Sequence, residues 1–339
     1  HNMAFQGRFW HLDMPLTGMD WNYFNHHFME AWGDLNLLKT GIAFSDQITT
    51  VSPTYAKEIC ADGGAYGLEA ILRLRQNDLT GILNGIDDQV WNPETDPHLP
   101  AHYNAETFES GKAACRRALR SRLNLPDDPS VPMFGMISRM TDQKGFDLIS
   151  DSADRLLNRN IQMVFLGTGD HSYEDRFRQL AQRYPNQVAV VIGFDDALAH
   201  QIEASSDVFL MPSRFEPCGL NQMYSLRYGT VPIVRKVGGL ADSVTDYSVG
   251  NEHLATGFVF EEYQSDRFAM TAERAIDVWH QKEIWRKLVR NGMTRDWSWR
   301  KSAVEYTQIY HRAIERISAR GTDPTHPISV LHSTDQRTS

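Results

Sequence analysis

The chain has 339 residues, of which 41% are hydrophobic and 23% are charged, a composition typical of a globular protein long enough for two domains. The formal net charge of -9 at pH 7 argues against nucleic acid or an anionic membrane surface as the main partner. Its 3 cysteines lie far apart, which favours a reducing compartment over a disulfide framework and excludes a zinc knuckle. No apolar run approaches the length of a membrane span.

The first part of the chain, from His1 to about Leu83, is irregular and rich in aromatic residues. Two stretches within or beside it have the pattern of a strand, Asp46–Pro53 and Gly81–Asp87. Two strands are too few to close a sheet. We therefore expect this segment to be only part of a domain.

The most regular stretch runs from Met133 to Glu262, where short apolar runs alternate with amphipathic ones. This alternation predicts a doubly wound parallel α/β sheet, in which ligands bind beyond the carboxyl ends of the strands. The amphipathic runs include the predicted helices Ser172–Arg183 and Ala197–Ser205. The predicted buried strands are Met133–Ser138, Gln162–Gly167, Gln187–Gly193, Val208–Ser213, Val231–Lys236 and Gly257–Glu262.

The end of the chain combines a helix with a polar tail. Asp296–Ile317 has the apolar spacing of an amphipathic helix. From Ser318 to Ser339 the sequence is rich in Thr, Ser, Asp and Pro, which predicts a disordered tail.

A basic loop follows the first strand of the regular stretch. Arg139 and Lys144 lie five residues apart there, just before a predicted helix that begins near Gly145. A guanidinium can hold two phosphate oxygens, an ammonium adds a point charge, and a helix start adds a positive dipole end. The alternative is a solvated basic loop. The position at a strand's carboxyl end favours a site for a diphosphate.

A second candidate site follows the strand Val208–Ser213. Glu216 precedes Pro217 and Gly219, whose pattern opens a helix. Its carboxylate could bind sugar hydroxyls or stabilise positive charge developing on a sugar ring. The alternative is a helix-capping role for Glu216. Cys218, with no histidine near it in the sequence, is expected to be a buried small residue rather than a nucleophile.

Other features give weaker indications. Gly167–Asp170 ends a strand and lets backbone approach a ligand, but it lacks the third glycine of a dinucleotide fingerprint, and Asp170 is expected to cap a helix. Gly238–Asp242 is another glycine turn into a helix. Phe194, just past the third strand, could stack on a nucleobase or belong to the core.

Metal-binding signals are weak. The sequence has no Asp-x-Asp pair that would hold a metal against a diphosphate. His98 and His102 are four residues apart, but Pro97 and Pro100 argue against a helix there and the sequence offers no evident third ligand. Cationic side chains and helix ends would therefore hold the phosphates.

Several of these segments resemble the family of bacterial glycogen synthases and plant starch synthases, and they keep the order and spacing of that family's motifs. The resemblance implies the GT-B fold, with two facing Rossmann-like domains. The matching segments are His1–Gly7, Val51–Ala56, Leu83–Asp87, Ser138–Arg139 with Gln143–Gly145, Pro212–Gln222 and Gly238–Asp242.

The resemblance implies a retaining glucosyltransferase that moves glucose from ADP-glucose to the non-reducing end of an α-1,4-glucan, with no metal or other cofactor. Its partners would be ADP-glucose and the glucan, with no nucleic acid and no membrane. Its place would be the bacterial cytoplasm, or the plastid stroma in a plant or alga. Arg139 and Lys144 would neutralise the diphosphate as ADP leaves. Donor glucose and phosphates would be held by Glu216, Cys218, Gly219 and Leu220.

The resemblance assigns further positions to the same substrate. His1 would hydrogen-bond the glucose from the opposite domain, and Asn84 would contact the same pocket. Phe194 stands where the family usually stacks a tyrosine on adenine. Gln143 and Gly169 complete the predicted substrate-binding residues.

The chain also departs from the family. A second glutamate found eight positions after the first in the wider superfamily is Tyr224 here, although this family commonly lacks that glutamate too. The family's amino-terminal Lys-x-Gly-Gly loop should lie upstream of His1, so we expect roughly the first third of the enzyme to be absent. The expected organisation is a partial acceptor-side domain over 1–83, a donor-nucleotide domain over 84–295, a helix over 296–317 that crosses back to the first domain, and the tail over 318–339.

Two alternatives stay open at this stage. The missing loop motivates a non-catalytic fragment that binds nucleotide or glucan only. A phosphorylase-type enzyme of similar architecture would require a lysine bearing pyridoxal phosphate.

Overall fold

The computed structural model describes residues 1–320, and the chain divides into two compact units. Among the described residues, one unit contains residues 1–82 together with residues 300–320, and the other contains residues 83–299. The boundaries expected from the sequence, after residues 83 and 295, lie within a few residues of these. Of the expected tail, residues 318–320 belong to the last helix, and the rest lies outside the described residues.

The second unit is built on a six-stranded sheet in the order β11-β10-β9-β6-β7-β8, with every neighbouring pair parallel. All six predicted strands are present, with ends within two residues of those expected. The strand order reverses between β6 and β9, which lie side by side although two other strands separate them in the chain. Their bounds are β6 Met133–Ile137, β7 Gln162–Gly167, β8 Val188–Ile192, β9 Val208–Met211, β10 Val231–Arg235 and β11 Phe258–Phe260.

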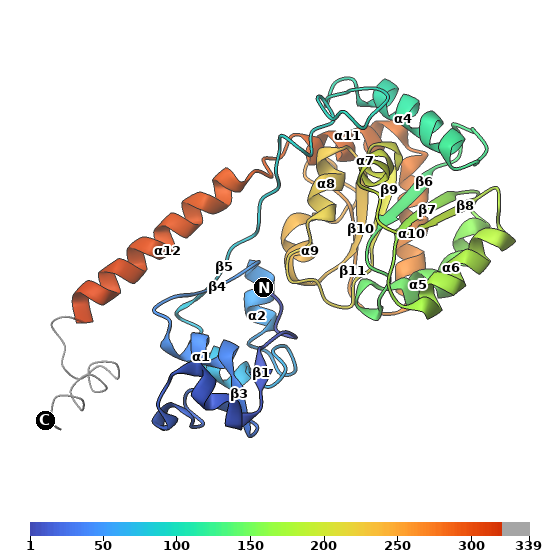
Figure 1. Ribbon diagram of the computed structural model, residues 1–339. Helices are drawn as coiled ribbons and strands as arrows, with labels where there is room; N and C mark the ends of the chain where they lie inside the picture. Colours follow the sequence, from blue (N-terminus) through green and yellow to red (C-terminus); the bar gives the residue numbers. More distant parts are fainter. Residues whose placement is uncertain (321–339) are drawn as a thin grey trace, which may run out of the picture. The chain divides into compact units, whose positions relative to one another are not determined.

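Helices cover both faces of this sheet (Figure 1). Phe134 and Met136 of β6 pack in a core shared with α5 and α10, whereas Met133 faces a second core shared with α4 and α7. Burial on both faces explains why these strands appear as unbroken apolar runs. Burial of each large apolar side chain contributes roughly 1.5–3 kcal/mol to the free energy of unfolding. The helices are α4 Phe108–Arg122, α5 Phe146–Leu157, α6 His171–Arg183, α7 Asp196–Ser205, α8 Asn221–Arg227, α9 Gly238–Ser243, α10 Ser265–Trp279 and α11 Lys282–Met293.

The first unit has only small sheets within its described residues. Strands β1 (Arg8–Phe9), β3 (Asp34–Asn36) and β2 (Glu30–Ala31) form an antiparallel sheet, and β4 (Ile48–Thr50) pairs in parallel with β5 (Leu79–Gly81). The helices of the unit are α1 Leu37–Phe44, α2 Pro53–Glu58, α3 Glu69–Leu74 and α12 Trp299–Arg320.

The strand expected over Gly81–Asp87 was placed wrongly: β5 ends at Gly81, where that strand was expected to begin. The register pairs Gly81 with Thr50, the last residue of β4, so no partner strand continues beyond it. Pairing, rather than the apolar pattern after Gly81, determines where the strand lies.

The last helix, α12, begins at Trp299, three residues later than expected. The carboxylate of Asp296 accepts a hydrogen bond from the Ser298 N–H, which holds the preceding residues in a turn. Within the first unit, Arg316 of α12 forms an ion pair with Asp78 and donates to the Asp46 carbonyl at 2.8 Å. No helix among residues 1–320 is both long enough and apolar enough to cross a membrane.

A buried lysine and a buried glutamate connect three helices of the second unit. Lys112 of α4 donates to the carbonyls of Ala204 and Tyr228, each at 3.1 Å, and to the Thr230 hydroxyl at 2.7 Å. Glu203 of α7 accepts from Ser225 of α8 at 2.7 Å. Burial lowers the pKa of Lys112 to about 7 and raises the pKa of Glu203 to about 8.

The raised pKa of Glu203 makes stability depend on pH. The folded chain keeps this proton up to about pH 8, whereas the unfolded chain releases it near the ordinary value of 4.5. Stability is therefore lost as pH rises through that window, by up to about 1.4 kcal/mol per pH unit. We predict that the melting temperature of Glu203→Gln rises relative to that of the parent chain as the pH increases from 5 to 7. Lys112 adds its own pH dependence only above this range. The exposed Glu106→Gln is the control, and its melting temperature should differ from that of the parent chain by the same amount at every pH. A constant difference for Glu203→Gln as well would contradict the prediction.

Candidate active site

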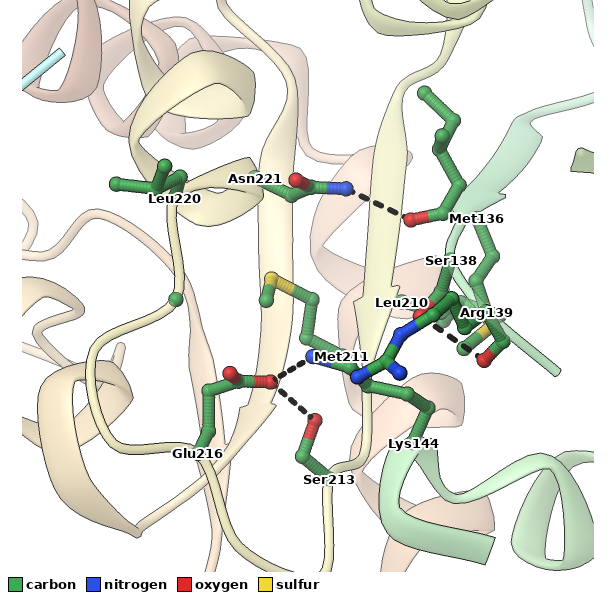
Figure 2. A pocket seen from close by; sticks show the side chains of 12 residues that line it. Met136, Ser138, Arg139, Lys144, Leu210, Met211, Ser213, Glu216, Leu220 and Asn221 are labelled. Carbon is green, nitrogen blue, oxygen red and sulfur yellow. Dashed lines mark hydrogen bonds and ion pairs between the residues drawn. The ribbon is translucent and has the colours of Figure 1, made fainter. Parts of the chain in front are cut away.

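A pocket of about 350 Å³ opens at the carboxyl ends of β6 and β9, where the strand order reverses (Figure 2). The loops that follow these two strands supply its polar side chains. This is the position at which open parallel sheets bind their ligands. The lining residues are Met136, Ile137, Ser138, Arg139, Lys144, Leu210, Met211, Ser213, Glu216, Gly219, Leu220 and Asn221.

An ion pair joins the two sides of the pocket. Lys144 Nζ lies 2.6 Å from Glu216 Oε2, and the Ser213 hydroxyl donates to the same oxygen at 3.1 Å (Figure 2). Both charged side chains are mostly buried, with 19% and 8% of their surface exposed. The carboxylate of Glu216 is therefore used inside the pocket, and the helix-capping alternative is wrong. Helix α8 begins after Leu220 without a side-chain cap.

Arg139 is the second cation of the pocket, and its guanidinium lies beside the ion pair (Figure 2). Within residues 1–320, no carboxylate pairs with it. Its charge is therefore available to an anion, whereas the charge of Lys144 is already balanced by Glu216. The pocket offers one free cation and one neutralised pair.

A glycine allows the two loops to meet. Gly145 has φ 78°, a left-handed conformation that glycine adopts without strain, and a Cβ there would lie 2.2 Å from the carbonyl oxygen of Pro212. Next to it, the Arg214 N–H donates to the Gln143 carbonyl at 2.8 Å. This backbone contact brings the residue before Gly145, Lys144, opposite Glu216. Gln143 itself lies beside the pocket, and its side chain donates to the Phe215 carbonyl at 3.2 Å.

The loop that carries Glu216 is supported from its other side by α9. A Cβ on Gly238 would lie 2.0 Å from the Glu216 carbonyl oxygen, and the Gly239 N–H donates to that oxygen at 3.2 Å. The glycine turn noticed in the sequence therefore positions Glu216 through its backbone.

Cys218 is buried, and burial raises the pKa of its thiol to about 11, as expected for a small packed residue rather than a nucleophile. The backbone of Asn84 forms a hydrogen bond with this thiol. Gly219 and Leu220, which follow Cys218, line the pocket. The two predicted residues Asn84 and Cys218 do not line it, and they support these neighbours from behind.

The predicted residues on the neighbouring strands lie outside the pocket. Gly169 follows β7, and its N–H donates to the carboxylate of Glu174 at 3.0 Å, so this donor is already used. Asp170 occupies the N-cap position of α6, but its side chain makes no capping hydrogen bond. Phe194 follows β8 and is 92% exposed, which excludes a role in the core.

His1 belongs to the other unit, so the structure does not place it against the pocket. The structure adds two residues that were not predicted as site residues. Ser213 hydrogen-bonds Glu216, and Asn221 donates to the Ile137 carbonyl at 2.7 Å, which ties the start of α8 to the end of β6. Both lie within five residues of Glu216 in the sequence, and this proximity was the signal from which they could have been predicted.

Two family models match the chain. The family described as glycosyl transferases group 1 matches residues 116–292, more than half of the chain and most of the sheet that forms the pocket. The chain belongs to this family. The starch synthase catalytic domain matches residues 1–74.

Relatives of this group 1 glycosyltransferase agree with both matches. A glycogen synthase of Anaeromyxobacter dehalogenans is 50% identical over 91% of this chain, and one of Rhodopirellula baltica is 47% identical over 93%. The chain spans 64% and 63% of the lengths of these relatives. The resemblance to glycogen and starch synthases is confirmed.

A solved structure is also similar. The catalytic domain of starch synthase IV from Arabidopsis thaliana, bound to ADP and acarbose, matches with a TM-score of 0.87 at 36% identity, covering 93% of this chain and 66% of the other. The predicted α/β fold of the GT-B type is confirmed.

The contact at Gly145 can be tested by adding one methyl group. Gly250→Ala is a matched control, because Gly250 also has a positive φ of 98° but a Cβ there would meet nothing within 4 Å. We expect the control to lose about 1 kcal/mol of unfolding free energy, from backbone strain alone. Gly145→Ala should lose roughly 1–3 kcal/mol more, because the methyl group overlaps a backbone carbonyl. Equal losses in denaturant titrations would show that the two loops do not meet as described.

Proposed function

We propose that the protein is a retaining glucosyltransferase that moves glucose from ADP-glucose to the non-reducing end of an α-1,4-glucan. The observation that carries the proposal is the unpaired guanidinium of Arg139 beside the Lys144–Glu216 pair, in a chain whose relatives are glycogen synthases. The starch synthase bound to ADP and acarbose supports both substrate classes.

The diphosphate would bind at the two cations. Arg139 presents a planar fork suited to phosphate oxygens, and Lys144 is held at the adjacent position by the loop that ends at Gly145. The first-turn N–H groups of α5, which begins at Phe146, add a positive dipole end. As the bond between glucose and ADP breaks, negative charge grows on the diphosphate. These groups stabilise that charge without having to move.

Glu216 would act on the sugar side. Its carboxylate is fixed by Lys144 and Ser213 and is mostly buried, so it can accept hydrogen bonds from donor glucose hydroxyls in a fixed orientation. Its negative charge also suits the positive charge that develops on the sugar ring. Lys144 therefore has two roles, one toward the diphosphate and one in positioning Glu216.

Four further parts of the proposal rest on the family. Phe194, exposed beyond β8, would stack on adenine, and His1 would reach the glucose from the other unit. Transfer would need no metal, because the cations of the pocket take its place at the diphosphate. The proposed setting is the bacterial cytoplasm, or the plastid stroma in a plant or alga.

A second candidate function is binding of nucleotide or glucan without transfer. The observation that favours it is the length of the chain, which spans 64% of a glycogen synthase relative. The donor side of the pocket is contained within residues 136–221, so nucleotide binding would not require the part of the relatives that the chain does not match.

Transfer of labelled glucose from ADP-glucose to glycogen tests the proposal. We expect incorporation by this chain and a loss of at least roughly 100-fold in Lys144→Ala, because the variant lacks a charge at the developing anion and leaves Glu216 unpaired. Lys287→Ala, which removes an exposed lysine, is the matched control and should stay unchanged.

ADP binding measured by calorimetry separates the two candidates. Absent transfer together with ADP binding that is lost in Lys144→Ala would support the binding-only function. Transfer that persists in Lys144→Ala would overturn the proposed site.

A further inference from the structure

A cluster of histidine and aspartate side chains lies outside the pocket, in the second unit. His98, Asp196 and His200 each offer a ligand atom, and these atoms all lie within 4.8 Å of one another. Asp196 and His200 are four residues apart on α7, so they share one face of that helix. His98 comes from the segment before α4. None of the three lines the pocket of Lys144 and Glu216.

The buried member of the cluster is held rigidly. Asp96 Oδ2 lies 2.7 Å from His200 Nδ1 and accepts from the Tyr228 hydroxyl at 2.5 Å. The ring of Trp91 stacks on the ring of His200, with centroids 3.8 Å apart and planes 9° from parallel. These contacts fix the orientation of the His200 ring and occupy its Nδ1 atom with a hydrogen bond. The other ring nitrogen, Nε2, has no hydrogen-bond partner within residues 1–320 and can bind a ligand.

Asp96 is buried, and hydrogen-bonding groups surround its carboxylate. Oδ1 accepts from the His98 backbone N–H at 2.9 Å, and Oδ2 faces both His200 Nδ1 and the Tyr228 hydroxyl. A carboxylate that binds one ring nitrogen of a histidine makes the other nitrogen a better and well-oriented metal ligand.

Sequence spacing suggested another metal-binding partner for His98. It paired His98 with His102 and offered no third ligand. In the structure, His102 Nε2 lies 2.8 Å from the Asp96 carbonyl oxygen instead, and the other two members of the cluster come from α7.

A core histidine with a buried aspartate partner is the simpler explanation, and it accounts for His200 and Asp96. It does not account for His98 and Asp196. Their side chains are 37% and 65% exposed, and His98 Nε2 and Asp196 Oδ2 approach to 4.0 Å, too long for a hydrogen bond. A shared ligand explains why two accessible side chains lie near a preoriented imidazole.

We propose that His98, Asp196 and His200 form a Zn²⁺ site. Two imidazoles and one carboxylate are a ligand set that Zn²⁺ accepts, with water in a fourth position. Ligand atoms around a tetrahedral Zn²⁺ lie about 3.4 Å apart, so the exposed His98 and Asp196 side chains have to close separations of up to 4.8 Å, a movement on the order of 1 Å that a side-chain rotation supplies. The rigid His200 ring needs no adjustment.

The ion would fasten two parts of the second unit. His98 belongs to the segment between residues 83 and 107, which has no helix or strand of its own, and α7 packs on the sheet. Zn²⁺ would hold this segment on α7, next to the Trp91 ring that already stacks there. The site is therefore a structural clamp, distinct from the metal-free transfer proposed for the pocket.

The test uses the whole chain, stripped with a chelator and titrated with Zn²⁺ in a calorimeter. His98→Ala and Asp196→Asn alter accessible side chains, so both variants should fold, as circular dichroism can verify. We expect each to weaken Zn²⁺ binding by at least roughly tenfold and to remove the Zn²⁺-dependent rise in melting temperature seen in the parent chain. His253→Ala removes an exposed histidine of the same unit and is the matched control.

Other groups of the chain can also bind metal, such as the amino group of His1 and the neighbouring imidazoles of His26 and His27. The readout is therefore the difference in Zn²⁺ binding between variants rather than the total amount bound. Co²⁺ in place of Zn²⁺ should give the intense visible absorption of tetrahedral coordination in the parent chain and in His253→Ala only. Zn²⁺ affinity and melting temperature that are the same in all four proteins would overturn the site. Neither outcome bears on glucose transfer.

Discussion

The site depends on one close contact, the packing of the loop after β6 against the loop after β9. Strand reversal brings the carboxyl ends of these two strands together, but only the missing side chain at Gly145 lets their backbones meet at Pro212. Lys144 reaches Glu216 because it is the residue before that glycine. Gly238 repeats the arrangement on the far side of the Glu216 loop. The functional groups are thus oriented by main-chain contacts, which a change of side chain elsewhere disturbs little.

One rule describes the ionisable groups at four places in the second unit: a buried charge has a partner, a buried acid without an ion-pair partner stays neutral, and an unpaired charge lies where a ligand can reach it. Lys144 and Glu216 neutralise each other, and Asp96 is stabilised by three hydrogen bonds. The Glu203 carboxylate forms no ion pair within residues 1–320, and burial raises its pKa to about 8, so it meets the cost of burial by keeping its proton. Arg139, which has no carboxylate partner within residues 1–320, lines the pocket.

The sequence predicted best what depends on local pattern. The six strands of the second unit were recognised because both of their faces are buried. Arg139, Lys144 and Glu216 were predicted from their places after strand ends, and they line one pocket because topology brings those ends together. The strand at Leu79–Gly81 was misplaced because its position depends on pairing with Thr50, a long-range fact. The partners of His98 were missed for the same reason. His98 meets α7 only through the fold, whereas spacing along the chain pointed to His102.

The contrast between a chain of charge -9 and a pocket with a free guanidinium has a kinetic consequence. At a distance an anionic ligand meets a repulsive field, and it is attracted only within about 10 Å of Arg139, the screening length at 0.1 M salt. Added salt therefore weakens the long-range repulsion as well as the short-range attraction. Association would be slowest in dilute buffer, in contrast to proteins that steer their ligands electrostatically, while dissociation would quicken as salt is added.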